Sequence, residues 1–282
     1  MERTLARRAA CWISGLLALA FVLSGCASTG IERQARTLGM QERLVAGAPF
    51  THRIYATNSA SERAQSPSKP LLIVLIDGDG RAFIDRETVA SDPTAPRSEL
   101  LKALSAMPSR STLLFLGRPC YHQTADAQCH PRYWTTHRYS EAVVSSMAAA
   151  LGKARTSELN LLLVGYSGGG VLATLLAERL ADDTAGLITV AAPLGTDQWA
   201  NHHGYSQLVG SLRPNLEQVR LSSDCQRHLY GQRDLEVPLE LARRWMSPYS
   251  QALVETDANH RCCWGTALVN AIEQISGTCS RP

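Results

Sequence analysis

The chain has 282 residues, and its 28 lysines and arginines nearly balance its 25 aspartates and glutamates, which leaves a formal net charge of +3 at pH 7. This length is enough for one large domain. The small net charge gives no sign of a nucleic-acid partner or of a strongly charged surface partner.

The first 25 residues have the pattern of a removable signal peptide. Three arginines among the first eight residues precede an apolar stretch at residues 12–23, which is too short for a stable membrane span. The following run, Leu23-Ser24-Gly25-Cys26, resembles the lipobox of bacterial lipoproteins, in which the cysteine is lipidated and becomes the mature N-terminus. We therefore expect a lipid attached to Cys26 to anchor the protein in the bacterial cell envelope. Ala27 at the next position favours the periplasmic face of the outer membrane. An ordinary secretory signal or a short membrane anchor is the alternative.

Apolar runs and helical patterns alternate along the rest of the chain. Residues 26–41 are predicted to be a tether that could be partly helical, and residues 42–282 a single domain. The predicted strands are residues 43–47, 51–56, 71–76, 112–116, the run beginning at 161, 187–191, 226–230 and 252–256. The predicted helices are residues 99–107, 140–154, the segment following 170, 238–246 and 264–275. This alternation predicts a mostly parallel, twisted sheet of about eight strands with helices on both faces.

A serine flanked by glycines lies between a predicted strand and a predicted helix, in Gly165-Tyr166-Ser167-Gly168-Gly169. A Gly-x-Ser-x-Gly run in this context is typical of a nucleophile on a sharp strand-to-helix turn. Such a turn leaves no room for nearby side chains, which gives Gly165 and Gly169 a steric reason to be there.

An acid and a histidine follow the last two predicted strands. Asp234 lies in Gly231-Gln232-Arg233-Asp234-Leu235-Glu236-Val237-Pro238, and His260 follows residues 252–256. The order of serine, acid and histidine, together with the Gly-x-x-Asp-x-x-Val-Pro arrangement, resembles the α/β-hydrolase superfamily over residues 43–276. More narrowly, Asp-Gly-Asp-Gly at residues 77–80 is similar to uncharacterised bacterial α/β-hydrolase lipoproteins, a resemblance that implies no known reaction.

Other residues could fill the acid and histidine roles. The segment at residues 193–217 is predicted to be a loop, and it carries the runner-up acid, Asp197, which follows the preceding strand. His202 and His203 lie well before the last strand and are interpreted as lid or surface residues. Asp257 is too close to His260 in the chain to be the first choice.

The predicted chemistry assigns a role to each residue. His260 would take the proton of Ser167 and return it to the leaving group, while Asp234 orients the imidazole. The backbone N–H groups of Gly168 and Asp79, with Gly80 as the next choice, would form the oxyanion hole. An acidic side chain at position 77 or 79 could hinder catalysis unless it points away or pairs with Arg81.

Cysteine usage is consistent with export. Setting aside Cys11 in the signal and Cys26 leaves an even number, which favours disulfides in an oxidising compartment. The sheet ends at which they lie suggest Cys120–Cys129 and Cys225–Cys279 as pairs. The adjacent Cys262 and Cys263 could bridge each other, stay free or exchange with the first pair.

These features predict a cell-envelope serine hydrolase that cleaves an ester, thioester or amide through an acyl-enzyme on Ser167. The short connection between the sixth and seventh strands favours an esterase on modest substrates over a lid-gated lipase, whereas tethering to a membrane would suit lipid esters. The expected enzyme is therefore a carboxylesterase or lipase-like hydrolase of small-molecule or lipid acyl substrates. No cofactor is expected, and no metal, because no helix has His/Glu ligand spacing. The alternatives are a non-catalytic lipoprotein that uses the scaffold for binding, and a serine peptidase. The oligomeric state is left open.

Overall fold

The computed structural model describes residues 29–57, 71–106, 111–124, 126–155 and 159–279. The predicted signal peptide at residues 1–25 and the predicted lipidation site Cys26 lie outside the described residues. In the part of the chain that is described, no helix has both the length and the hydropathy needed to cross a bilayer.

An eight-stranded sheet, counted over the described residues, forms the centre of the molecule, in the order β1-β2-β4-β3-β5-β6-β7-β8. The first two strands are antiparallel to their neighbours, and the others run parallel. The strands are β1 (Met40–Ala46), β2 (Thr51–Thr57), β3 (Leu71–Ile76), β4 (Thr112–Leu116), β5 (Asn160–Tyr166), β6 (Thr184–Val190), β7 (Gln226–Gly231) and β8 (Leu253–Thr256).

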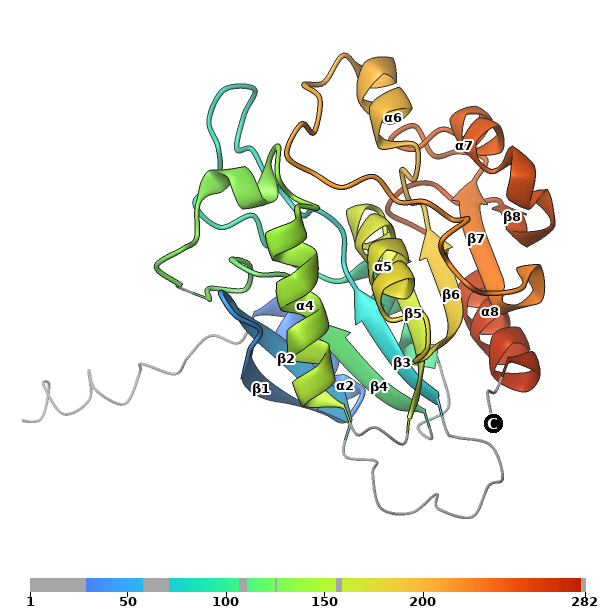
Figure 1. The fold of residues 1–282 in the computed structure, drawn as a ribbon, viewed down its shortest axis with the longest axis horizontal. Coiled ribbons are helices and arrows are strands. Elements are labelled where there is room, and N and C mark those ends of the chain that lie inside the picture. Colours follow the sequence, from blue (N-terminus) through green and yellow to red (C-terminus); the bar gives the residue numbers. More distant parts are fainter. Residues whose placement is uncertain (1–28, 58–70, 107–110, 125, 156–158, 280–282) are drawn as a thin grey trace, which may run out of the picture.

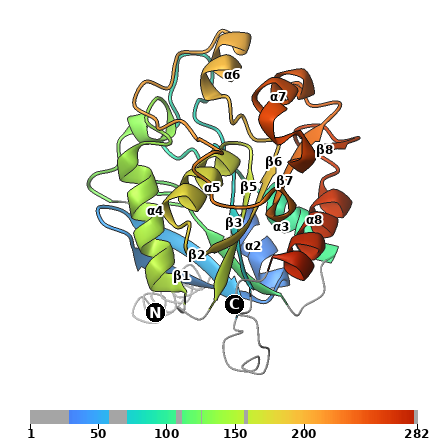
Figure 2. The ribbon, with the colours of Figure 1, turned by 45° about the vertical axis from the view of Figure 1, so that its right-hand side comes forward.

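Helices cover both faces of this sheet, as Figures 1 and 2 show. They are α2 (Gly30–Thr37), α3 (Glu99–Ala103), α4 (Glu141–Ala154), α5 (Gly168–Arg179), α6 (Thr196–His203), α7 (Leu239–Trp245) and α8 (Gly265–Thr278). Short 3-10 helices lie at Leu104–Ala106, Pro131–Trp134, Ser223–Cys225 and Ser247–Ala252. The predicted mostly parallel sheet with helices on both faces is confirmed.

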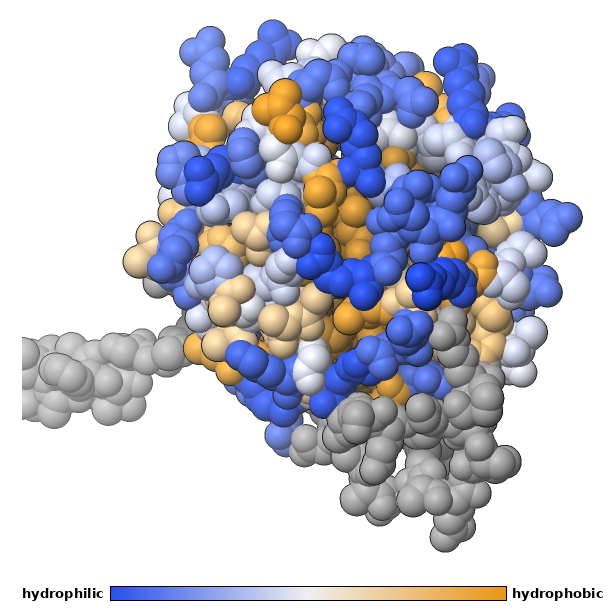
Figure 3. Space-filling view, in the orientation of Figure 1, coloured by the Kyte–Doolittle hydropathy of each residue, from blue (hydrophilic) through white to orange (hydrophobic). Residues whose placement is uncertain are grey.

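The apolar strand sequences follow from this double cover. Alternate residues of β5 enter opposite cores, with Leu161 and Leu163 facing α4 and α5, and Leu162 and Val164 facing α3 and α8. Both faces of the strand are buried, so residues 161–164 are hydrophobic without alternation. On the outer face drawn in Figure 3, polar residues predominate, and apolar residues show mainly as a stripe between them.

The described part of the predicted tether at residues 26–41 is helical and packs against the domain. Residues 30–37 form α2, and Met40 begins β1. Ile31 and Ala35 are buried, and the Gln34 side chain exchanges hydrogen bonds with the backbone of Ser98. The polar composition of the segment conceals two apolar side chains four residues apart, which lie on one face of a helix.

The predicted loop at residues 193–217 contains a helix that the sequence interpretation missed. Helix α6 has Asp197 in its first turn and His202 and His203 in its last, which suits the helix dipole. Gly204 ends it in the left-handed conformation, with φ 66°. These are recognisable helix signals, but the segment is too short and polar to show an apolar stripe.

Cysteines at both ends of the sheet are paired. The structure joins Cys120 to Cys129 and Cys225 to Cys279, which are 9 and 54 residues apart in the chain. Of the three possibilities left open for Cys262 and Cys263, the structure has a bridge between these neighbours.

Candidate active site

Ser167 lies on a sharp turn between β5 and α5. Its backbone has φ 52° and ψ −127°, a conformation that an L-residue adopts only where the surroundings enforce it. A Cβ at position 165 would overlap the carbonyl oxygen of Gly169, and a Cβ at position 169 would overlap the carbonyl oxygen of Ile76. The flanking glycines therefore allow the turn to pack directly against the end of β3.

His260 and Asp234 meet at this serine. The Nε2 atom of His260 is 3.2 Å from Ser167 Oγ, and its Nδ1 atom is 2.9 Å from Asp234 Oδ2. The three side chains come from the ends of β5, β7 and β8, which are parallel strands whose carboxyl ends share one edge of the sheet. This edge is where open α/β sheets bind their ligands.

The surroundings fix the orientation of the histidine. The His260 carbonyl oxygen accepts hydrogen bonds from the Tyr166 hydroxyl at 2.6 Å and from Trp264 Nε1 at 3.2 Å. The Tyr166 and His260 rings also lie 5.3 Å apart between centroids. The histidine loop is thus held by the residue directly before Ser167.

The other candidate residues lie elsewhere. Asp197 is exposed on α6 and forms an ion pair with Arg213 Nε at 2.6 Å, so it is not the partner of His260. His203 donates from Nε2 to the Glu236 carbonyl oxygen at 2.9 Å and stacks on Tyr205. Helix α6 therefore packs over the loop that carries Asp234, and its histidines do not contact Ser167 in the structure.

The candidate oxyanion residues flank the nucleophile. Gly168 is the first residue of α5, where the free N–H groups and the helix dipole favour negative charge. The loop after β3 lies against the serine, since a Cβ at Gly78 would be 3.0 Å from Ser167 Cβ. This arrangement places the Gly78-Asp79 segment beside the elbow.

The two acidic side chains of this loop have different partners. The Asp77 carboxylate accepts a hydrogen bond from Ser98 Oγ at 2.9 Å, at the N-terminus of α3. Burial raises the pKa of the Asp77 carboxyl to about 7. Asp79 instead forms ion pairs with Arg118 and Arg138.

Arg81, which the sequence offered as a possible partner for the acid at position 77 or 79, does not pair with Asp79 in the structure. Arg81 donates to the Ile84 carbonyl oxygen at 3.0 Å, within its own loop. Burial alone would raise the pKa of the Asp79 carboxyl, but the guanidinium groups of Arg138 and Arg118 outweigh this and hold the pKa well below its usual range. A signal for Arg118 existed, because it follows β4 by two residues and so lies at the carboxyl edge of the sheet.

Solved structures with the same architecture include several hydrolases. A bacterial membrane phospholipase A has 13% identity and a TM-score of 0.59, with 98% of this chain and 99% of that chain covered. An esterase of Pyrococcus furiosus has 12% identity and a TM-score of 0.52, with 86% and 90% covered. The chain has the α/β-hydrolase fold. A puromycin hydrolase shares this fold at 18% identity and a TM-score of 0.55, with 86% of this chain and 40% of that chain covered.

Sequence comparisons add no narrower family to the α/β-hydrolase fold. No protein-family model matches the sequence, and the search of curated proteins found no match. Among the described residues, no group of three or more His, Cys, Asp or Glu side chains is arranged to hold a metal ion.

Proposed function

We propose that this protein is a serine hydrolase that cleaves a carboxylic ester through an acyl-enzyme on Ser167. The observation that supports it is the chain of contacts from Ser167 Oγ to His260 Nε2 at 3.2 Å, and from His260 Nδ1 to Asp234 at 2.9 Å. A serine hydroxyl needs an adjacent base to become a nucleophile, and the base needs a third group to orient it.

The proposed reaction has two halves. Ser167 Oγ bonds to the carbonyl carbon while its proton passes to His260 Nε2, and the carbonyl electrons move onto the oxygen. The backbone N–H groups of Gly168 and Asp79 hydrogen-bond this oxyanion. When the C–O bond to the leaving alcohol breaks, the alcohol takes the proton from His260. Water then repeats the sequence, releases the carboxylic acid and restores Ser167.

Small-molecule and lipid esters are the proposed substrates. The connection between β6 and β7 contains only one short α-helix, α6, in its described residues, so the chain has little material there for a large lid. The phospholipase and esterase named above share the fold and support ester cleavage as the reaction class.

A cell-envelope location is proposed from the sequence alone. The signal-like start and the lipobox-like run ending at Cys26 support lipid anchoring, with the outer membrane as the favoured site. Growth with labelled palmitate should label the wild-type protein and leave Cys26→Ser unlabelled. Label on that variant, or none on the wild type, would exclude this anchor.

A fluorophosphonate probe tests the nucleophile. The wild type should be labelled and Ser167→Ala should not. The matched control is Ser146→Ala, because Ser146 Oγ also lies 2.8 Å from a histidine Nε2, that of His52, but both of these side chains are fully buried and so are closed to the probe. Retained labelling of Ser167→Ala contradicts the assignment. An unlabelled wild type that hydrolyses no ester favours the non-catalytic scaffold, and faster cleavage of aminoacyl amides than of esters favours a peptidase.

A further inference from the structure

Asp79 is the centre of a buried ionic cluster, here called the Asp79 cluster and formed with Arg118, Arg138 and Tyr139. Arg118 Nη1 donates to one carboxylate oxygen. Arg138 Nη1 at 2.9 Å and the Tyr139 hydroxyl at 2.7 Å donate to the other. These groups are largely removed from water, with the Asp79 side chain 18% exposed, and charge-assisted hydrogen bonds hold the cluster together.

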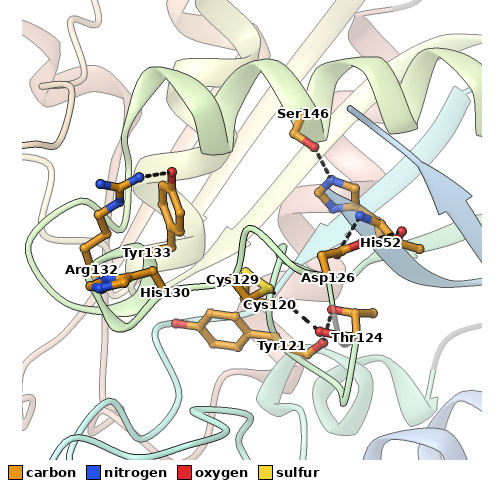
Figure 4. Close-up of a disulfide and its surroundings, with 11 residues drawn as sticks. His52, Cys120, Tyr121, Thr124, Asp126, Cys129, His130, Arg132, Tyr133 and Ser146 are labelled. Carbon is orange, nitrogen blue, oxygen red and sulfur yellow. Dashed lines mark hydrogen bonds between the residues drawn. A yellow bond between two sulfur atoms is a disulfide. The ribbon is translucent and has the colours of Figure 1, made fainter. Parts of the chain in front are cut away.

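The segment that supplies the arginines is itself fixed. Arg118 Nη2 donates to the Arg138 carbonyl oxygen at 3.1 Å, which joins the two ends of the connection between β4 and α4. Within this connection, Cys120 is bonded to Cys129, and Asp126 accepts two hydrogen bonds from Thr51 on β2. Figure 4 shows the disulfide and Asp126 side by side on this segment. These bonds therefore hold the segment that carries both arginines in place.

The Asp79 cluster contacts both candidate oxyanion donors. A Cβ on Gly168 would overlap the Asp79 carboxylate, so the carboxylate packs directly on the residue after the nucleophile. The backbone of Asp79 is held separately, because its carbonyl oxygen accepts a hydrogen bond from the Tyr121 hydroxyl at 3.1 Å. Side chain and backbone restraints together fix the loop whose N–H is assigned to the oxyanion.

The charges of the cluster do not cancel. Two guanidinium groups face one ionised carboxylate, which leaves a net charge of +1 beside the elbow. Arg118 is 2% exposed and Arg138 is 13% exposed, so water screens this charge weakly. A fixed positive charge in such a place stabilises negative charge that develops in the transition state.

We propose that Arg138 and Arg118 are positioning residues for the oxyanion hole: they anchor Asp79 so that its N–H meets the substrate oxygen, and their surplus positive charge stabilises the oxyanion. This inference rests on the proposed serine hydrolase function. It also gives the acid at position 79 a role, because its carboxylate forms the ion pairs that fix the loop.

A purely structural ion pair provides the comparison. The Arg155 side chain is 12% exposed, which is nearly the same as the exposed fraction of Arg138, and it pairs with Asp183. Asp183 directly precedes β6, so this pair lies at the amino ends of the parallel strands, opposite the elbow. A replacement of Arg155 by Gln removes the ion pair of an equally buried arginine, whose partner Asp183 is more exposed than Asp79, without touching the candidate site.

The experiment measures kcat and KM for a neutral aryl ester, and Ki for an arylboronic acid, which forms a tetrahedral anion on a serine oxygen. We expect Arg138→Gln to lower kcat about 10- to 100-fold, less than the loss of a direct oxyanion donor, with KM within threefold. Its Ki for the boronic acid should rise by the same factor as kcat/KM falls. Arg138→Lys should recover part of the loss, and Arg155→Gln should match the wild type.

The outcomes separate the two proposals. A wild type that the fluorophosphonate probe does not label contradicts the serine hydrolase itself. An active wild type with Arg138→Gln kcat within threefold, or with a loss confined to KM, overturns the positioning role alone. If Arg138→Gln does not fold, Tyr139→Phe and Arg138→Lys decide in its place, because each keeps the charge and weakens the hold on Asp79. Wild-type kcat and Ki in both would overturn the proposal.

Discussion

The Asp234 carboxylate binds the His260 ring with one oxygen and its own turn with the other. Oδ2 is 2.9 Å from His260 Nδ1, while Oδ1 accepts the backbone N–H groups of Glu236 and Val237, each at 2.9 Å. The side chain is fully buried. Because both oxygens are engaged, the carboxylate cannot rotate, and the ring it holds has one favoured orientation.

Replacing this acid should separate orientation from folding. In Asp234→Asn, the amide oxygen can still accept the two backbone N–H groups, but the amide nitrogen faces His260 Nδ1 and forces the wrong tautomer. We expect kcat to fall by about 10³- to 10⁴-fold with little loss of thermal stability. Asp197→Asn is the control and should keep wild-type kcat, because Asp197 pairs with exposed Arg213. A larger loss for Asp197→Asn than for Asp234→Asn would reverse the assignment of the acid.

The contact between Gly168 and Asp79 gives a steric test. The Cβ of Gly168→Ala would displace the Asp79 carboxylate and shift the candidate oxyanion loop. We expect kcat to fall about 10- to 100-fold, since small misplacements of catalytic groups have effects of this size. Gly152→Ala is the matched control, on the exposed side of α4 with no atom within 4 Å of the new methyl group. It should leave kcat unchanged and stabilise the fold by about 0.5–1 kcal/mol. Equal kcat in both variants would contradict the packing argument.

The disulfides should differ in their effect on stability. Cys225–Cys279 closes a loop of 54 residues and Cys120–Cys129 one of 9. Because a longer closed loop restricts the unfolded chain more, replacing Cys225 and Cys279 with serines should lower the free energy of unfolding by about 4 kcal/mol. The same change at Cys120 and Cys129 should lower it by about 2.5 kcal/mol. Urea unfolding of the two double variants measures this. A larger loss for the shorter loop would show that local packing outweighs chain entropy here.

Asp77 should make the stability depend on pH. Its pKa is about 7 in the folded protein, because of burial, against an ordinary value of 3.8. Between these values the folded state keeps a proton that the unfolded state has lost, so this group's contribution is fully present below pH 4 and is lost as the pH rises through 7. We expect the wild type to lose up to about 4 kcal/mol relative to Asp77→Asn between pH 4 and pH 8.

Urea midpoints of both proteins at intervals across this range test the prediction. The other titrating groups are common to the two proteins, so their effects cancel in the difference. A difference in unfolding free energy that stays constant with pH would show that Asp77 is ionised throughout.

Much of the fold could be predicted because its signals are local. Continuous apolar runs such as Leu71–Ile76 mark strands buried on both faces, and the chain order of Ser167, Asp234 and His260 places each after a strand. Parallel strands then bring these ends to one edge of the sheet. The structure places the three side chains in one hydrogen-bonded row for this reason.

The partners of Asp79 could not be predicted in the same way. Arg118 and Arg138 are 39 and 59 residues away in the chain, and the choice between them and nearby Arg81 depends on the path of a long connection. The packing of helix α2 could not be predicted for a related reason, since its two buried side chains contact a core that is formed by residues later in the chain. Contacts that depend on the path of a loop, rather than on a periodic pattern of residues, could not be predicted from the sequence.

The distance along the chain between Ser167 and His260, 93 residues, has a consequence for biosynthesis. A nascent chain that ends after α6 already contains the elbow and both candidate oxyanion residues, but neither the acid nor the base. Strands β7 and β8 complete one edge of the sheet, and the bond between Cys225 and Cys279 joins the residue before β7 to the residue after α8. Under the proposed mechanism, the enzyme is therefore inert until β7, β8 and the loops that follow them have joined the sheet.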